Sequence, residues 1–181
     1  YCCPGGRNAY IVALDKRDGS TLWVNDSLED PVGYATPIIA DIDGVRQLIT
    51  LSARRVFAVS TENGQLLWDF PFGNKRGNNA TDALVRDNHV VVSSGYGKGT
   101  ALLRPTRAEN AKFSVNLIWE STLLDNHHGG IILDGAYVYG AGHEARGWFC
   151  LDLKTGRQSW QAPGKGSLTI GDGHLYCLDE R

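Results

Sequence analysis

One eleven-residue pattern recurs three times without gaps, and it constrains the fold more than any other feature of the sequence. The three copies are ALDKRDGSTLW, AVSTENGQLLW and CLDLKTGRQSW, at residues 13–23, 58–68 and 150–160. Each begins with a small residue, has glycine at its seventh position and ends in tryptophan. A degenerate fourth unit, residues 100–119, keeps the closing tryptophan. The closing tryptophans lie 41 to 51 residues apart, a period typical of β-propeller blades rather than helical repeats.

Short β-rich segments separated by turn dipeptides fill each period. The strands A to D that we expect in the second unit are residues 35–41, 46–52, 55–60 and 65–70. Asp43-Gly44 and Asn63-Gly64 separate A from B and C from D, and such dipeptides favour tight hairpins because Asn and Gly tolerate positive φ. The sequence therefore predicts an all-β chain made of β-propeller blades, each with four antiparallel strands.

The repeat resembles the tryptophan-docking motif of quinoprotein-like β-propellers, A-x-D-x-x-[T/N/D]-G-x-x-x-W. Longer stretches, GYATPIIADIDGVRQLI, NHHGGIILDGAYVYG and GKGSLTIGDGHLYCL, resemble a bacterial subgroup of PQQ-like repeat proteins. The superfamily includes pyrroloquinoline quinone (PQQ) alcohol dehydrogenases and a cofactor-free lipoprotein that assists outer-membrane barrel assembly. Ser60 departs from the motif's Asp and Cys150 from its Ala. The resemblance implies a periplasmic or otherwise extracytoplasmic bacterial protein.

Face-to-face stacking of neighbouring blades gives a physical reason for the motif, because each sheet needs a large flat apolar group and a small partner that receives it. The expected core tryptophans are Trp23, Trp68, Trp119 and Trp160. The small residues expected to leave room for the rings are Ala13, Ala58 and Cys150.

The 181 residues hold about four blades' worth of chain. The predicted parts are a C–D pair (9–24), three full blades (35–70, 81–120 and 129–162) and an A–B pair (167–178). An open arc exposes two apolar blade faces, and the lost burial amounts to roughly 10 kcal/mol at about 25 cal/mol per Å². We therefore expect a partial propeller that belongs to a ring of about eight blades, and self-association through the terminal blades when these residues are alone.

The composition excludes two classes of partner. The chain has 18 Lys+Arg against 20 Asp+Glu, a net charge of −2, which argues against general affinity for nucleic acid. No apolar run approaches the roughly 18 residues of a membrane span. The partner that we expect is instead a protein or a small polar ligand.

The connections D-to-A and B-to-C leave a four-stranded blade on one face, and here they are irregular, whereas the hairpins on the opposite face are uniform. Irregular loops on a rigid scaffold usually carry function. The ligand-binding candidates on this loop face are Asn78, Asn79, Asp82, His127, His128 and Lys165. The segment NHHGG is the leading candidate, either as a polar or metal-binding group or as loop histidines that bond neighbouring loops. Adjacent strand residues point in opposite directions, so we expect no metal site there.

Cys2 and Cys3 raise the question of a redox cofactor, since adjacent cysteines form a strained disulfide beside the quinone of some dehydrogenases. Such an enzyme also needs a Ca²⁺ site of carboxylate and amide oxygens, an Asp base and an Arg. Asp82, Asp125 and Glu144 lie on the loop face, but no motif distinguishes them. We therefore expect buried thiols, also at Cys150 and Cys177, and neither cofactor nor catalytic residues.

The leading functional hypothesis is a non-catalytic binding or scaffold module. A PQQ- and calcium-dependent alcohol dehydrogenase is the alternative, and a carbohydrate-binding or carbohydrate-active propeller is the third hypothesis.

Overall fold

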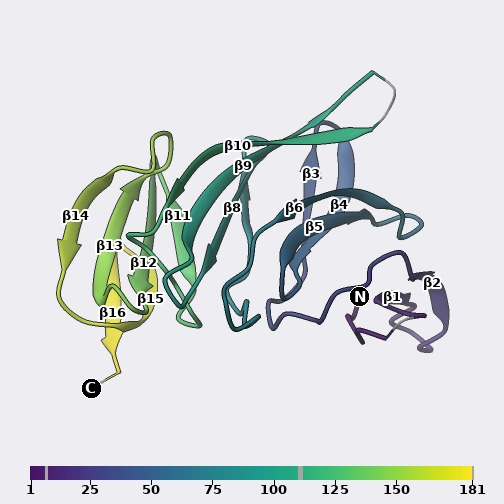
Figure 1. Ribbon diagram of the computed structural model, residues 1–181, viewed down its shortest axis with the longest axis horizontal. Coiled ribbons are helices and arrows are strands. Elements are labelled where there is room, and N and C mark those ends of the chain that lie inside the picture. The colour runs from purple at the N-terminus through teal and green to yellow at the C-terminus, as the bar shows by residue number, and fades with distance from the viewer. Residues whose placement is uncertain (7, 110–111, 181) are drawn as a thin grey trace.

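The computed structural model describes residues 1–6, 8–109 and 112–180, and every regular element among them is a β-strand. Three four-stranded antiparallel sheets follow one another, with a two-stranded sheet at each end (Figure 1). The end sheets are β1 (Ile11–Leu14) with β2 (Thr21–Asn25), and β15 (Gly166–Gly171) with β16 (His174–Asp179). The all-β prediction of four-stranded antiparallel blades is confirmed.

Each four-stranded sheet is a meander in which consecutive strands pair. The second sheet contains β3 (Ile38–Ile42), β4 (Val45–Leu51), β5 (Arg55–Ser60) and β6 (Leu66–Pro71). The third contains β7 (Leu84–Arg86), β8 (His89–Ser94), β9 (Gly99–Arg107) and β10 (Phe113–Ser121). The fourth contains β11 (Ile131–Asp134), β12 (Tyr137–Gly142), β13 (Gly147–Asp152) and β14 (Gln158–Ala162). Figure 1 shows the sheets side by side in an open row, with the two termini at opposite ends.

The turns between A and B strands use the residues that tolerate positive φ. Asp43 and Gly44 have φ of 46° and 74°, and Asp87 and Asn88 have 48° and 60°. Two residues in the left-handed region form a two-residue hairpin whose twist matches that of the strands. The turn dipeptides in the sequence therefore determine where each sheet begins to fold back.

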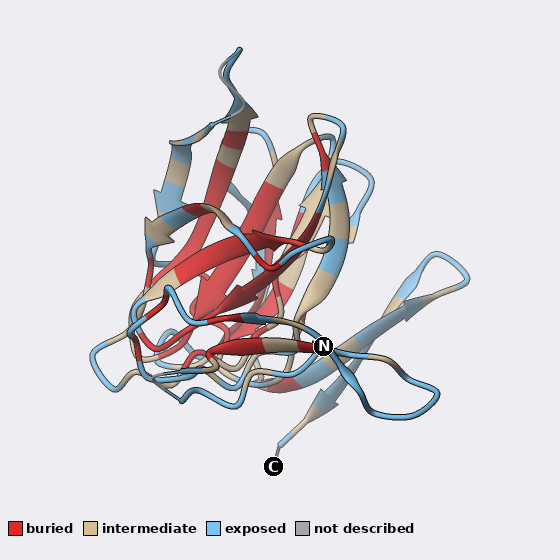
Figure 2. Cartoon of the chain, turned by 90° about the vertical axis from the view of Figure 1, so that its right-hand side faces the viewer, coloured by how far each residue is buried: buried red, intermediate tan, exposed pale blue. Residues whose placement is uncertain are grey.

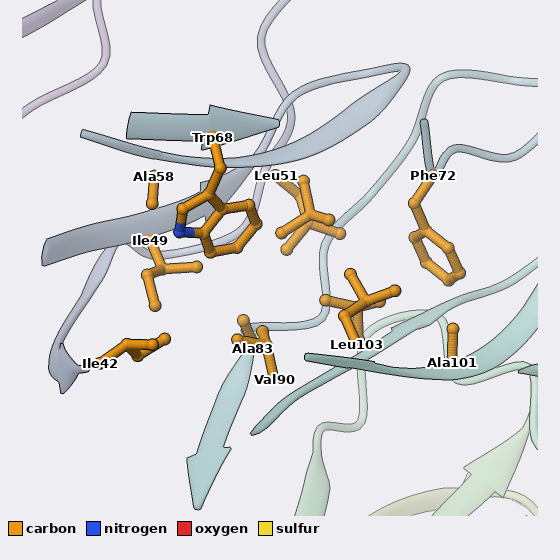
Figure 3. Close-up of a cluster of buried hydrophobic side chains, with 12 residues drawn as sticks. Ile42, Ile49, Leu51, Ala58, Trp68, Phe72, Ala83, Val90, Ala101 and Leu103 are labelled. Atoms are coloured by element: carbon orange, nitrogen blue, oxygen red, sulfur yellow. The ribbon is translucent and has the colours of Figure 1, made fainter. Parts of the chain in front are cut away.

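The core lies between neighbouring sheets rather than within one of them. In Figure 3, Trp68 and Leu51 from the second sheet face Val90 and Leu103 from the third, and all four side chains are buried. A corresponding cluster joins the third and fourth sheets. Figure 2 shows buried residues concentrated in the middle sheets, whereas the C-terminal strand pair is mostly exposed.

Two closing tryptophans lie on a glycine turn of the next sheet. The indole Nε1 of Trp23 donates to the carbonyl of Thr61 at 3.0 Å, and a Cβ on Gly64 would lie 2.5 Å from the Trp23 ring. Trp119 repeats the arrangement with the carbonyl of Leu153 at 2.8 Å and with Gly156, where a Cβ would lie 2.6 Å away.

The small residues of the repeat lie beside the tryptophan of their own sheet, and not on the neighbouring sheet that receives its ring. Ala13, Ala58 and Cys150 are the cross-strand partners of Trp23, Trp68 and Trp160 within the same sheet. For Trp23 the surface that receives the ring is the glycine of the neighbouring sheet, which can approach closely because glycine has no Cβ.

Trp68 and Trp160 depart from this arrangement. Trp68 is 4% exposed and donates to the side-chain oxygen of Gln47 at 2.7 Å, because the next sheet carries the long β9–β10 hairpin instead of a glycine turn. Trp160 is 40% exposed. The expectation that it belongs to the core was wrong, because the sheet that follows it consists of β15 and β16.

A β-bulge precedes the tryptophan in all four D strands. The pairing register shifts so that Leu22, Leu67, Ile118 and Ser159 have no partner on the C strand. A bulge bends its strand and re-aims the next side chain. It therefore orients the indole relative to the neighbouring sheet.

Candidate functional site

One buried carboxylate ties the irregular loops of the third and fourth sheets together. Asp125, in the β10–β11 loop, is 1% exposed. Its oxygens accept the backbone N–H groups of Gly97 at 2.9 Å, His143 at 2.7 Å and Glu144 at 3.0 Å. Gly97 lies between β8 and β9, and the other two lie between β12 and β13. The D-to-A and B-to-C loops therefore meet on one face, as the strand connectivity predicts.

The neighbouring residue adds a second buried tie. Asn126 donates from Nδ2 to the carbonyl of Ala141 at 3.0 Å, and its Oδ1 accepts the hydroxyl of Thr81 at 2.8 Å. Buried polar groups that are satisfied in this way fix a single arrangement of the loops. The face is consequently a preorganised surface.

Four aromatic and imidazole side chains, here called the histidine cluster, gather above these ties: Tyr96, His127, His128 and His143. The His127 ring centroid lies 4.8 Å from those of His128, His143 and Tyr96. The two adjacent histidines therefore do not point apart. The expectation that they do was wrong, because they lie in a loop and not on a strand. Gly95 permits the approach, since a Cβ there would lie 2.9 Å from the His127 Cβ.

Burial makes two members of the cluster, His127 and His143, resist protonation. Desolvation, followed by the charge of a neighbouring histidine, lowers the pKa of His127 below its usual 6.5. Desolvation and then Lys165 lower the pKa of His143. The Nδ1 atoms of both rings are buried without a hydrogen-bond partner among the described residues. At neutral pH the His127 and His143 rings are thus uncharged.

A cleft lies beside the histidine cluster, with a volume of about 420 Å³. We call it the basic cleft and define it by its polar lining: Tyr34, Arg54, Asn74, Lys75, Arg76 and Asn78. The Arg76 guanidinium lies 5.2 Å from the centroid of the Tyr96 ring, so the cleft and the histidine cluster adjoin. Asn78 was predicted as a binding residue from its loop, and the structure places it in this lining.

Asparagine side chains hold the loop of the cleft rigid. Asn74 accepts the N–H of Arg76 at 2.8 Å and donates to the Asn78 carbonyl and the Ser94 hydroxyl, both at 2.8 Å. Asn79 is fully buried and donates to the Ser52 carbonyl at 2.6 Å. The predicted binding residue Asn79 therefore lies beneath the surface and supports the loop.

The remaining candidates lie further along the face. Asp82 accepts the N–H of Thr36 at 2.5 Å, which joins the second and third sheets. Lys165 forms an ion pair with Glu180 at 3.3 Å, and His128 lies 3.7 Å from the same carboxylate. Lys165 and His128 thus adjoin each other, whereas Asp82 belongs to another part of the face.

Sequence reasoning did not single out Tyr34, Arg54, Asn74 or Tyr96. The first three come from separate loops, so no local motif connects them. Tyr96 lies in the glycine-rich segment GYGKG and has a φ of 58°. Few residues other than glycine adopt this left-handed conformation.

The cysteines are thiols without a disulfide bond. Burial, and then the neighbouring Cys2, raise the pKa of Cys3 to about 11. Cys150 is buried as expected, but Cys2 and Cys177 are exposed. The expectation of burial was wrong for these two because Cys2 makes only an isolated bridge to Val12 at the edge of the first sheet, and Cys177 is on the open strand β16.

The three acids named as candidates for a calcium–quinone site each contact other groups of the chain. The Asp125 oxygens already accept several backbone N–H groups, Asp82 accepts from Thr36, and Glu144 pairs with Lys75 at 3.4 Å. Within residues 1–6, 8–109 and 112–180, no three His, Cys, Asp or Glu side chains are placed to hold a metal ion. No helix in the described part of the chain is long and apolar enough to cross a membrane.

The sequence is similar to a protein family and to part of one larger protein. A family model described as outer membrane protein assembly factor BamB matches residues 5–162. A DNA ligase from Methanosphaerula palustris (strain ATCC BAA-1556 / DSM 19958 / E1-9c) is 25% identical over 146 residues, which is 77% of this chain and 23% of that protein.

Among solved structures, the quinohemoprotein alcohol dehydrogenase ADHIIG from Pseudomonas putida HK5 is similar with a TM-score of 0.51 at 19% identity. The match covers 75% of this chain and 21% of the dehydrogenase chain, and it shows the fold. The chain spans less than a quarter of either relative. With the family model matching most of its length, the chain belongs to the PQQ-like repeat β-propellers described as outer membrane protein assembly factor BamB.

Proposed function

We propose that the chain is part of an extracytoplasmic, periplasmic β-propeller that serves as a non-catalytic binding or scaffold module. Its binding surface is the loop face that carries the histidine cluster and the basic cleft. The family supports this location and role, since the matching model is described as an outer-membrane assembly factor.

The engagement of Asp125 carries the proposal. A catalytic base or a cation ligand needs an oxygen that can reach its substrate or ion. Both oxygens of Asp125 accept backbone N–H groups from two other loops, and the residue is 1% exposed. This carboxylate therefore organises the face, and the side chains left at the surface are suited to recognition.

Those surface side chains are of the types that binding sites favour. Tyrosine and arginine are enriched at the energetically important positions of interfaces. Here Arg76 lies over Tyr96, and Tyr34 is 72% exposed beside them on the cleft. We further propose that binding requires neither PQQ nor calcium.

Site-specific photo-crosslinking in the full-length protein tests the binding surface. A photoreactive phenylalanine analogue at Tyr96 should give one discrete crosslinked product in the native host. The same analogue at Lys16, which lies in the exposed turn between β1 and β2 on the opposite face, should give none. Equal crosslinking at both positions would contradict the assignment of the face.

Cofactor retention tests the alternative. Purified protein is mixed with PQQ and Ca²⁺, passed over a desalting column and examined for quinone absorbance. We expect the absorbance to elute with the free cofactor. Retained absorbance together with dye-linked alcohol oxidation would establish the dehydrogenase and overturn the non-catalytic module.

A further inference from the structure

We propose that the basic cleft binds an extended acidic segment of a partner protein, with carboxylates seated on Arg54 and Arg76. The inference rests on the proposed binding function and names the ligand chemistry of that face. Its support comes from the charge, the shape and the rigidity of the cleft.

The charge of the cleft is positive. Arg54, Lys75 and Arg76 line it, and none of its ten lining residues is acidic. The nearest acids are already engaged: Asp30 is 1% exposed at its side chain and lies 3.5 Å from the Nε atoms of Arg54 and Arg55. Glu144 lies 3.4 Å from Lys75.

Arg76 is the cation of the cleft whose guanidinium is most available to a ligand. No carboxylate among the described residues lies within ion-pair distance of its guanidinium, which packs on the Tyr96 ring. The planar guanidinium presents paired N–H donors that match the two oxygens of a carboxylate. Stacking on Tyr96 holds that plane in place, so a ligand pays little ordering entropy.

The shape favours a polypeptide over a small anion. The volume of about 420 Å³ lies within the range of pockets that enclose an organic ligand. One wall is apolar and exposed, with Val32 at 39% and Tyr34 at 72%. An isolated phosphate would leave this wall uncovered, whereas an extended chain places acidic side chains on the cations and apolar ones on the wall, since alternate side chains point to opposite sides.

The rigidity of the cleft follows from its asparagine supports. The side chain of Asn74 bonds the backbone on both sides of Arg76, through the Arg76 N–H and the Asn78 carbonyl. Gly77 holds a φ of 70° between them. The two neighbouring cations of this loop are therefore presented from a fixed turn.

Fluorescence anisotropy with a labelled octapeptide of alternating glutamate and alanine measures the proposed binding. The unaltered protein should bind this peptide at least tenfold more tightly than the matching glutamine–alanine peptide. Arg76→Gln should weaken binding of the glutamate peptide at least tenfold, and Arg54→Gln should weaken it as well. Arg157→Gln, an exposed arginine in a C–D turn, is the matched control and should leave the affinity unchanged.

Thermal unfolding of each variant accompanies the titration, because Arg54 also neutralises buried Asp30. Arg76 neutralises no buried carboxylate among the described residues. The peptide affinity of Arg76→Gln therefore tests the inference even if Arg54→Gln fails to fold. Equal affinity for the two peptides, or unchanged binding by Arg76→Gln, would overturn the inference. Binding of inorganic phosphate that displaces the peptide completely at equal concentration would also overturn it, in favour of a small-anion site. If crosslinking at Tyr96 persists while the peptide fails to bind, the loop-face function stands and the acidic ligand is wrong.

Discussion

The contact between a tryptophan and a glycine is the smallest unit that joins one sheet to the next. In two places an indole N–H donates to the carbonyl three residues before a turn glycine, and the ring lies on that glycine. The glycine adopts positive φ and has no Cβ, and both properties are needed for the turn and the approach. We propose that this contact is the docking interaction implied by the repeat.

Gly64 and Gly44 allow the two properties to be separated, because both have a φ of 74°. A Cβ on Gly64 would meet Trp23, whereas a Cβ on Gly44 would meet nothing within 4 Å. Gly64→Ala should therefore reduce the free energy of unfolding by about 1–3 kcal/mol more than Gly44→Ala, the usual cost of overpacking. Urea denaturation measures both, and equal losses would mean that the ring does not press on the turn.

Trp68 and Trp160 form a second matched pair, with the same repeat position and different burial. Trp68→Ala should lower the free energy of unfolding by about 3–5 kcal/mol, since it empties a large buried aromatic site. Trp160→Ala should cost less than about 1 kcal/mol in the same chain, because Trp160 is 40% exposed. A loss below about 1 kcal/mol for Trp68→Ala would contradict the packing of the second sheet against the third.

At the scale of the elements, loops and one long hairpin distinguish the third sheet from the others. The β9–β10 hairpin is longer than the other C–D pairs, and its Arg107 N–H donates to Asp43 of the second sheet at 3.0 Å. Asp125 joins the loops of the third and fourth sheets on the opposite face. Both features act across sheets and so hold the meanders in a fixed relation.

Asp125→Ala tests the tie between the loops. The substitution leaves the N–H groups of Gly97 and Glu144 without their side-chain acceptor, and the loss of free energy of unfolding should be about 2–4 kcal/mol. Asp26→Ala, an exposed loop carboxylate, should stay within about 0.5 kcal/mol of the unaltered chain. Chemical denaturation compares the two, and similar values would show that Asp125 does not organise the face.

The lowered pKa values of His127 and His143 predict a loss of stability in acid. Well above pH 6.5 both imidazoles are neutral whether the chain is folded or unfolded. As the pH falls below 6.5, the unfolded chain binds protons first, so stability decreases until the pH passes the lowered folded values. The melting temperature should thus fall between pH 7 and pH 5 more steeply in the unaltered protein than in His127→Gln/His143→Gln, and parallel pH profiles would refute this.

At the scale of the whole molecule, the two end sheets have complementary features. Tyr1 lies 5.5 Å from Trp23 and Tyr139 lies 6.0 Å from Trp160, measured between ring centroids. Tyr176 occupies the same position of its hairpin as Tyr139, and it is 54% exposed. We propose that the exposed apolar side chains of β16 in one copy pack against those of the β1–β2 sheet in another, which include Leu22 and Val24.

Sedimentation of residues 1–181 on their own tests this self-association. The expected species is larger than the 19.8 kDa monomer, because exposed apolar side chains of the end sheets become buried. Tyr176→Asp/Leu178→Asp, at two exposed positions of β16, should shift the distribution toward monomer. A compact, cooperatively folded monomer of the unaltered chain at micromolar concentration would contradict the proposal.

The sequence by itself determined the features that depend on a few neighbouring residues. Turn dipeptides such as Asp43-Gly44 favour a reversal of the chain whatever surrounds them, since their φ preferences are local. The spacing between Trp68 and Trp119 indicated the blade repeat. The order of strands in a four-stranded blade placed the segment NHHGG on the same face as the other irregular loops.

Only the tertiary structure decided the features that depend on a neighbouring sheet. The exposure of Trp160 and Cys177 follows from what packs against them, and burial is a property of the assembled molecule. The basic cleft brings together Tyr34, Arg54 and Arg76 from three separate loops. No local pattern encodes such a meeting, because distances between loops are set by how the sheets stack.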